Sequence, residues 1–184
     1  MEEGLLQHNQ YRAKHHVRDL GFDDELTEKA LQCAEYYAER GTIDHSCPYK
    51  GEAGENLAWT MSSFGSPSEM VAIRKAVRDW YNEIKNYNFE HPGNSTGVTG
   101  HFTQLVWRGT ISVGLGSYRH EGSKRTYTCA LYGPKGNLRW FGEDQYRFYR
   151  ENVLKYDSKV SAEEAIETTT LIPPAATEFQ SLDS

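Results

Sequence analysis

Apolar residues recur along the first half of the chain with the period of an amphipathic helix. Over Asp24 to Arg40 they occupy positions i, i+4, i+7, i+8, i+11 and i+12 counted from Leu26, a spacing that places them on one face. Acidic residues at the start of this segment suit the positive end of a helix, and Gly41 ends it. The pattern predicts a helix over 24–40, preceded by a less regular helix over 3–16.

A third helix is predicted from its start signals. Ser66 is a good N-cap, Pro67 suits the first helical position, and Glu69 completes a capping box. An apolar stripe then extends from Met70 to Ile84 with helical spacing.

A short fourth helix is predicted at the head of a conspicuous apolar run. Thr99 and Gly100 can both begin a helix, after which His101 and Leu105 lie one turn apart on the same face. A histidine on a packed helix has a fixed ring direction, which a metal or proton-transfer site requires.

The second half of the chain changes to the alternation of β-strands. Residues 112–118 and 125–132 alternate, and a turn at 121–124 joins them into a hairpin. Residues 138–141 are a candidate for a further strand, whereas 42–60, with its glycines and proline, is expected to be irregular. Helices followed by an antiparallel hairpin predict an α+β fold with the sheet between helices.

Composition divides the chain into one domain over 1–156 and a tail over 157–184. The net charge is −6, of which the tail, with six acids and one base, carries −5. The body is therefore nearly neutral, which disfavours nucleic acid as a partner but leaves room for a local basic patch. We expect the tail to be mostly disordered, with a short helix near Ser161–Glu167. A docking segment at Leu171–Pro174 is the alternative to a merely solvated tail.

The three cysteines, Cys33, Cys47 and Cys129, are too few for a disulfide scaffold and lack zinc-knuckle spacing. One disulfide with a free thiol remains open, and Cys47 is expected to be structural. The simplest compartment is the reducing cytoplasm. Secretion with a removed leader is the alternative, and only then would the sequon at 94–96 matter.

The first residues show no apolar signal-peptide core and carry Glu2 where myristoylation needs glycine, and no apolar run approaches the length of a membrane span.

Five short motifs, in this order along the chain, resemble the CAP superfamily, which comprises cysteine-rich secretory, antigen 5 and pathogenesis-related 1 proteins. The stretch from Trp80 to Pro92 is most similar to the Golgi-associated plant pathogenesis-related protein group. The motifs are HNQYR at 8–12, GENLAW at 54–59, WYNEI at 80–84, GHFTQLVWRGT at 100–110 and CALYGPKGN at 129–137.

The resemblance implies an α-β-α sandwich with a central antiparallel sheet and a cleft. In that cleft it implies a tetrad of His45, Glu55, Glu83 and His101. Two imidazoles suit zinc or another divalent cation, and two carboxylates suit orientation of the rings. Two protein ligands fall short of the three usual in catalytic zinc sites, so weak, acid-sensitive binding is expected. The alternative is a polar network that satisfies itself.

We therefore expect a non-enzymatic protein that binds sterol, fatty acid or a membrane surface peripheral to the Golgi. The resemblance also implies homodimers, and the tail is a candidate for a protein partner. Met61, Phe64, Met70 and Val71 are candidates for a lipid site, although such residues are more often core.

The rival function is a metal-dependent hydrolase, in which His45 and His101 hold zinc and Glu55 or Glu83 is the general base. The chain has none of the G-x-S-x-G, H-E-x-x-H or P-loop motifs. The remaining histidines are expected to be surface or motif-structural residues: His8, His15, His16, His91 and His120.

Overall fold

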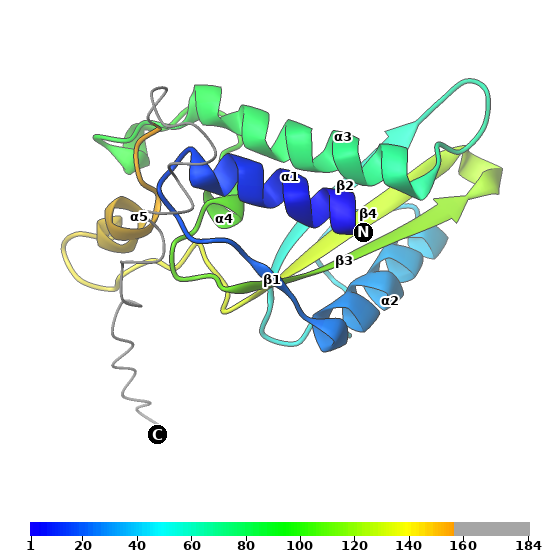
Figure 1. Ribbon diagram of the computed structural model, residues 1–184, viewed down its shortest axis with the longest axis horizontal. Coiled ribbons are helices and arrows are strands. Elements are labelled where there is room, and N and C mark those ends of the chain that lie inside the picture. Colours follow the sequence, from blue (N-terminus) through cyan, green and yellow to red (C-terminus); the bar gives the residue numbers. More distant parts are fainter. Residues whose placement is uncertain (157–184) are drawn as a thin grey trace.

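The computed structural model describes residues 1–156, so every expectation for the tail lies outside the described residues. A four-stranded sheet forms its centre, with the strands in the order β1-β3-β4-β2 (Figure 1). β1 pairs with β3 in parallel, and the other pairs are antiparallel. The strands are β1 (Gly21–Phe22), β2 (Gly54–Met61), β3 (Ser112–His120) and β4 (Arg125–Gly133).

The predicted hairpin is confirmed, but two other expectations for strands are wrong. β3 and β4 pair along their full length, with Ser117 opposite Thr128. The supposedly irregular 42–60 stretch contains β2, which pairs with β4 at the edge of the sheet. Residues 138–141 form no strand.

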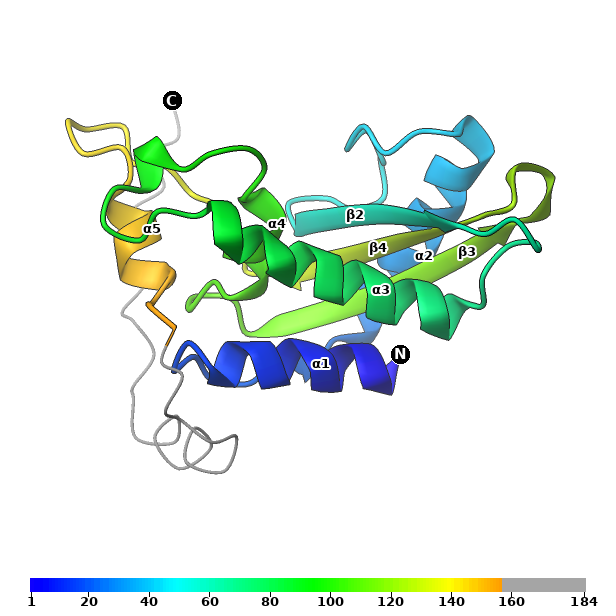
Figure 2. The same cartoon turned by 90° about the horizontal axis from the view of Figure 1, so that it is seen from above.

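Helices cover both faces of the sheet, which confirms the α-β-α sandwich. α2 (Asp24–Arg40) packs on β3 and β4, while α1 (Glu2–Ala13) and α3 (Glu69–Asn82) run side by side over the opposite face (Figures 1 and 2). The close approach of α2 depends on glycine, because a Cβ at Gly114 would lie 2.1 Å from the backbone of Leu26. No helix of residues 1–156 has the length and apolarity to cross a bilayer.

The boundaries of α2 match the prediction, whereas α1 and α3 differ. α1 ends at Ala13 because His16 has a φ of 54°, a left-handed conformation that a helix cannot include. α3 begins later than predicted: Ser68, and not Ser66, is the N-cap, and its hydroxyl accepts a hydrogen bond from the N–H of Val71.

The remaining helices are short. They are α4 (Gly100–Leu105), α5 (Arg147–Asn152) and the 3₁₀ turns η1 (Glu83–Asn86), η2 (Pro92–Asn94) and η3 (Glu121–Ser123).

Candidate functional site: two histidine–glutamate pairs beside strand β2

His45 and Glu55 form the first pair. His45 lies between α2 and β2 with a φ of 61°, and Glu55 is the second residue of β2. The Nδ1 of His45 lies 2.7 Å from Oε2 of Glu55. The Glu55 side chain is 2% exposed, whereas that of His45 is 50% exposed, so the glutamate anchors a ring that faces solvent.

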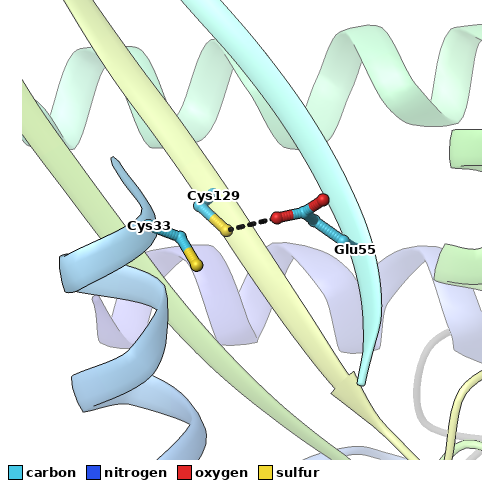
Figure 3. A group of neighbouring side chains, drawn as sticks. All are labelled: Cys33, Glu55 and Cys129. Carbon is cyan, nitrogen blue, oxygen red and sulfur yellow. Dashed lines mark hydrogen bonds between the residues drawn. The ribbon is translucent and has the colours of Figure 1, made fainter. Parts of the chain in front are cut away.

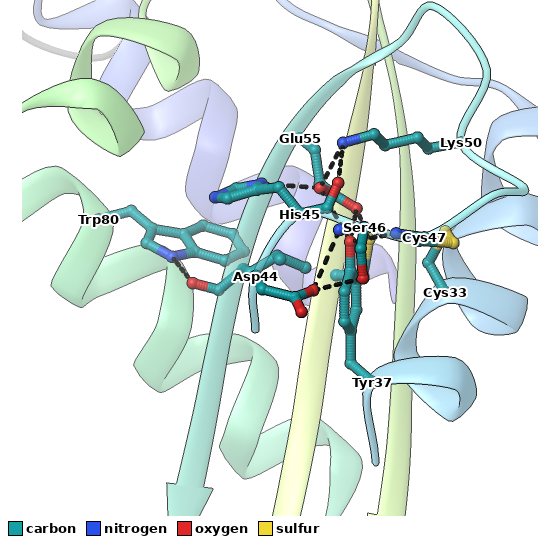
Figure 4. Close-up of polar contacts among 11 residues, drawn as sticks. Cys33, Tyr37, Asp44, His45, Ser46, Cys47, Lys50, Glu55 and Trp80 are labelled. Carbon is teal, nitrogen blue, oxygen red and sulfur yellow. Dashed lines mark hydrogen bonds and ion pairs between the residues drawn. A yellow bond between two sulfur atoms is a disulfide. The ribbon is translucent and has the colours of Figure 1, made fainter. Parts of the chain in front are cut away.

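Three further donors surround the Glu55 carboxylate, of which Figure 4 shows Tyr37 and Lys50 and Figure 3 shows Cys129. The Tyr37 hydroxyl donates to both oxygens at 3.0 and 3.2 Å, and Lys50 Nζ lies 3.1 Å from Oε2. The Cys129 thiol, 3.8 Å away, donates to Oε1. Burial by itself would raise the pKa of Glu55, but the hydrogen bonds from His45, Lys50 and Tyr37 outweigh it and lower that pKa. The residue is therefore a fully hydrogen-bonded carboxylate.

His101 and Glu83 form the second pair. Nδ1 of His101 lies 2.7 Å from Oε1 of Glu83. The other oxygen of Glu83 accepts the backbone N–H groups of His101 and Phe102 at 3.1 and 3.3 Å. Thr99 is the N-cap of α4 but makes no side-chain cap bond. Glu83 therefore caps this helix in place of the expected threonine, and it fixes the His101 ring at the same time.

Strand β2 connects the two pairs. Neighbouring residues of a strand point to opposite faces, so Asn56 faces away from the Glu55 side. Its Nδ2 donates to the carbonyl of His101 at 3.0 Å. Next along the strand, the carbonyl of Leu57 accepts the indole N–H of Trp80, whose ring stacks on His101 with centroids 6.1 Å apart. Asn56 and Trp80 were not expected to be site residues, although both lie inside the motifs quoted for the resemblance.

The hydrogen bonds favour one tautomer of both imidazoles. In a neutral ring, an Nδ1 that lies beside a carboxylate donates its proton to that carboxylate, and Nε2 then presents a lone pair. Within residues 1–156 neither Nε2 has a hydrogen-bond partner. Each Nε2 is therefore a nitrogen of the kind that ligates zinc and similar divalent cations. No three members of the tetrad bring their ligand atoms within 4.8 Å of one another in the described residues.

The cysteines differ from the simplest sequence expectation. Cys33 and Cys47 form a disulfide, while Cys129 is a buried thiol, the alternative that the sequence left open. Disulfides are typical of oxidising compartments, whereas the reducing cytoplasm was the simplest expectation. Cys47 is buried and structural, and its N–H donates to the Tyr37 hydroxyl at 2.9 Å.

Two histidines expected at the surface or in structural motifs are buried. The His8 ring bonds to the carbonyl of Gly4 at 2.7 Å and to the hydroxyl of Tyr132 at 2.8 Å. Burial lowers the pKa of His8 to about 4 and that of His15 to about 4 as well. His8 lies inside the HNQYR motif, whereas His15 lies outside the quoted motifs and is buried by its packing. His16 and His120 are half-buried and His91 is exposed.

Two surfaces are relevant to the expectation of a lipid site. The candidates Met61, Phe64, Met70 and Val71 are exposed and do not belong to the core. Separately, α1 and α3 border a groove of about 610 Å³ with mostly polar walls. Its lining residues are Glu3, Leu6, Gln7, Gln10, Tyr11, Ala13, Lys14 and Arg74.

Comparison with known proteins gives consistent matches. The model of the cysteine-rich secretory protein family (CAP) matches residues 5–132. The chain is 41% identical over 154 residues to human Golgi-associated plant pathogenesis-related protein 1, covering 83% of this chain and 90% of that protein. It is 37% identical to salivary antigen-5 of Dipetalogaster maximus, covering 75% and 55% respectively. It is 33% identical to pathogenesis-related protein PR-1 of Medicago truncatula, and the match covers 77% of this chain and 76% of that protein.

Solved structures agree in fold. A crystal structure of NaASP2 with Zn²⁺ superposes with a TM-score of 0.63 at 19% identity, covering 90% of this chain and 93% of that one. Schistosoma mansoni venom allergen-like protein 4 gives a TM-score of 0.59 at 23% identity, and the match covers 86% of this chain and 95% of that one.

Proposed function

The chain belongs to the cysteine-rich secretory protein family, and from that premise we propose that it is a binding protein that docks on phospholipid surfaces and does not catalyse hydrolysis. The observation that carries this proposal is a set of exposed apolar side chains on β2, α3 and the connection between them. The set, called here the apolar end, consists of Trp59, Met61 and Phe64, with Met70 and Val71 in the first turn of α3.

The apolar end lies where the β2–α3 connection and the β3–β4 hairpin project side by side (Figures 1 and 2). Phe64 is 100% exposed in the β2–α3 connection. A fully exposed phenylalanine among other exposed apolar residues is unfavourable in water, and it gains about 1.5–3 kcal/mol on burial in an apolar medium. A lipid surface offers such a medium.

Basic residues border the apolar end. Arg125 lies opposite Met61 in the sheet, and its guanidinium is 4.2 Å from the ring centroid of Trp59. Lys124 occupies the adjoining turn. Neither has an ion-pair partner among residues 1–156, whereas Arg119 pairs with Glu121 at 3.0 Å. Apolar side chains flanked by cations match the interface of a bilayer, where acyl chains lie beneath phosphate groups.

The groove between α1 and α3 is a weaker candidate for a sterol or fatty-acid site. Five of its eight lining residues are polar or charged, whereas pockets for apolar ligands have predominantly apolar walls. For this reason we assign lipid contact to the apolar end.

The two carboxylates argue against the hydrolase alternative. A general base needs a pKa near the working pH and a lone pair that faces substrate. The pKa of Glu55 is lowered and both its oxygens are hydrogen-bonded, while Glu83 is occupied by His101 and the start of α4. Both residues orient the histidines, and all four of their carboxylate oxygens already accept hydrogen bonds.

A second function, weak zinc binding, is favoured by the two Nε2 atoms. His45 and His101 would supply the ligands, and Glu55 and Glu83 would hold the rings. A relative in fold, NaASP2, is described with Zn²⁺. Two protein ligands leave the remaining positions to water, so the expected affinity is low.

The disulfide supports a location in the Golgi lumen or outside the cell. The named relatives include a Golgi-associated and a salivary protein. Homodimerisation, which the resemblance implies, stays a prediction.

Vesicle flotation tests the docking proposal. Wild-type protein should float with phospholipid vesicles, and Phe64→Ser should weaken binding at least about tenfold, since the loss of one buried phenylalanine exceeds 1.4 kcal/mol. Phe141→Ser is the matched control: Phe141 is equally exposed on the β4–α5 segment at the opposite end (Figure 1). An equal loss of vesicle binding in Phe64→Ser and Phe141→Ser, or no flotation of the wild type, would refute docking through the apolar end.

A further inference from the structure

A second group of potential metal ligands lies between α2 and the sheet. One ligand atom from each of Cys33, Glu55 and Cys129 lies within 4.8 Å of the other two, and these residues come from α2, β2 and β4 respectively (Figure 3). Among residues 1–156, no other three His, Cys, Asp or Glu side chains bring their ligand atoms within 4.8 Å of one another. Cys47 brings a third sulfur to the same place, because it is bonded to Cys33.

The spacing is close to what a tetrahedral ion needs. Zinc–sulfur bonds of about 2.3 Å place two thiolates about 3.8 Å apart, and a carboxylate oxygen lies slightly closer to a thiolate. Cys129 Sγ and Glu55 Oε1 are 3.8 Å apart. The bonded sulfurs of Cys33 and Cys47 must separate before both can bind the ion.

The surroundings resemble a closed structural site. Cys33 and Cys129 are fully buried, and the exposed fractions of Cys47 and of the Glu55 side chain are 3% and 2%. Thiolate ligands favour zinc over harder cations such as magnesium and calcium. Lys50, 3.1 Å from Glu55, would offset part of the excess negative charge of three thiolates and one carboxylate.

We propose that reduction of the Cys33–Cys47 disulfide converts this group into a zinc site with three cysteine ligands and Glu55. A thiol reductant supplies two electrons and two protons, is itself oxidised to a disulfide, and leaves Cys33 and Cys47 as thiols. Zinc then displaces the thiol protons and binds Cys33, Cys47, Cys129 and Glu55.

The site requires neither His45 nor His101, so it does not rest on the function proposed above. Glu55 nevertheless joins the two places, because its Oε2 holds His45 while its Oε1 faces Cys129. In an oxidising compartment the disulfide closes the core. In a reducing one, zinc takes over the same cross-link between α2, the 42–53 segment and the sheet.

Cadmium titration tests this site with a signal specific for sulfur, since cadmium–thiolate bonds absorb in the ultraviolet and cadmium–imidazole bonds do not. The Cys47→Ser variant, kept in a phosphine reductant, retains the three ligands that the structure places together and cannot form the native disulfide. We expect it, and the reduced wild type, to bind one equivalent of cadmium with thiolate absorption. Zinc in large excess should compete for the same site and lower that absorption, and near-ultraviolet circular dichroism should stay that of a folded chain.

The matched variant Cys47→Ser/Cys129→Ser should lose at least about tenfold in affinity, and Glu55→Gln in the Cys47→Ser background should also bind more weakly. The oxidised wild type should give no thiolate signal, while His101→Ala should retain the full signal after reduction. A reduced wild type without thiolate absorption would overturn the proposal. So would an affinity unchanged by loss of Cys129, or a signal that appears only when the chain is unfolded.

Discussion

Glu83 holds both the imidazole and the backbone N–H of His101, with its two oxygens 2.7 and 3.1 Å from the respective nitrogen atoms. One carboxylate thus begins helix α4 and sets the direction of the ring that α4 carries. The position of this histidine and the stability of its helix are consequently linked.

Glu83→Ala should therefore destabilise the fold, although Glu83 is not part of the apolar core. Loss of the N-terminal acceptor should lower the free energy of unfolding by about 0.5–2 kcal/mol, measured by urea denaturation. Thr99→Ala is the control, since Thr99 makes no side-chain cap bond, and it should change little. A larger effect at Thr99 than at Glu83 would contradict this assignment of the cap.

Acid should destabilise the protein through His8 and His15. Burial lowers the pKa of each to about 4, below the ordinary value of about 6.5 in the unfolded chain. Between these values the unfolded state binds more protons, so stability present above pH 6.5 is lost as the pH falls toward 4. For the fully buried His8 the loss amounts to about 3 kcal/mol.

The measurement is the free energy of unfolding at pH 7 and pH 5 for the wild type and His8→Gln. The variant should be less stable at pH 7 but should lose less stability on acidification. An identical loss in both proteins would show that His8 does not contribute to the pH dependence.

Zinc binding by the two His–Glu pairs should require both rings. Isothermal titration of the oxidised protein, whose disulfide removes the thiolate alternative, should show weak binding that is abolished by His45→Ala or by His101→Ala. Binding should weaken as the pH falls, because only neutral imidazoles ligate. The control is His91→Ala, a change at an exposed histidine, which should leave the zinc affinity unchanged. Zinc binding that persists in His45→Ala or in His101→Ala would contradict the second proposed function.

The sequence predicted the elements whose apolar residues pack on one face. α2 was predicted with its observed ends because its stripe, its acidic start and Gly41 all agree. β2 was missed because an edge strand that carries Glu55 and Asn56 does not show the apolar alternation of an ordinary strand. The apolar alternation that indicates a strand is weakest in the part of β2 that presents polar side chains to the candidate site.

The contacts that fix the site residues were beyond sequence reasoning because they join distant positions. The buried His15 forms a hydrogen bond with the carbonyl of Leu154, far along the chain. Glu83, at the end of α3, accepts a hydrogen bond from the first turn of α4. The resemblance supplied the four tetrad residues, but it did not indicate that Glu55 shares its oxygens with Lys50, Tyr37 and Cys129.

The most direct test of docking through the apolar end is quenching of tryptophan fluorescence by vesicles of brominated phospholipid. Trp59 and Trp140 are similarly exposed, while Trp80 and Trp107 are buried. We expect strong quenching in the wild type and in Trp140→Phe, and loss of most of that quenching in Trp59→Phe. Quenching that is retained in Trp59→Phe and lost in Trp140→Phe would place the membrane at the opposite end and contradict the proposed function.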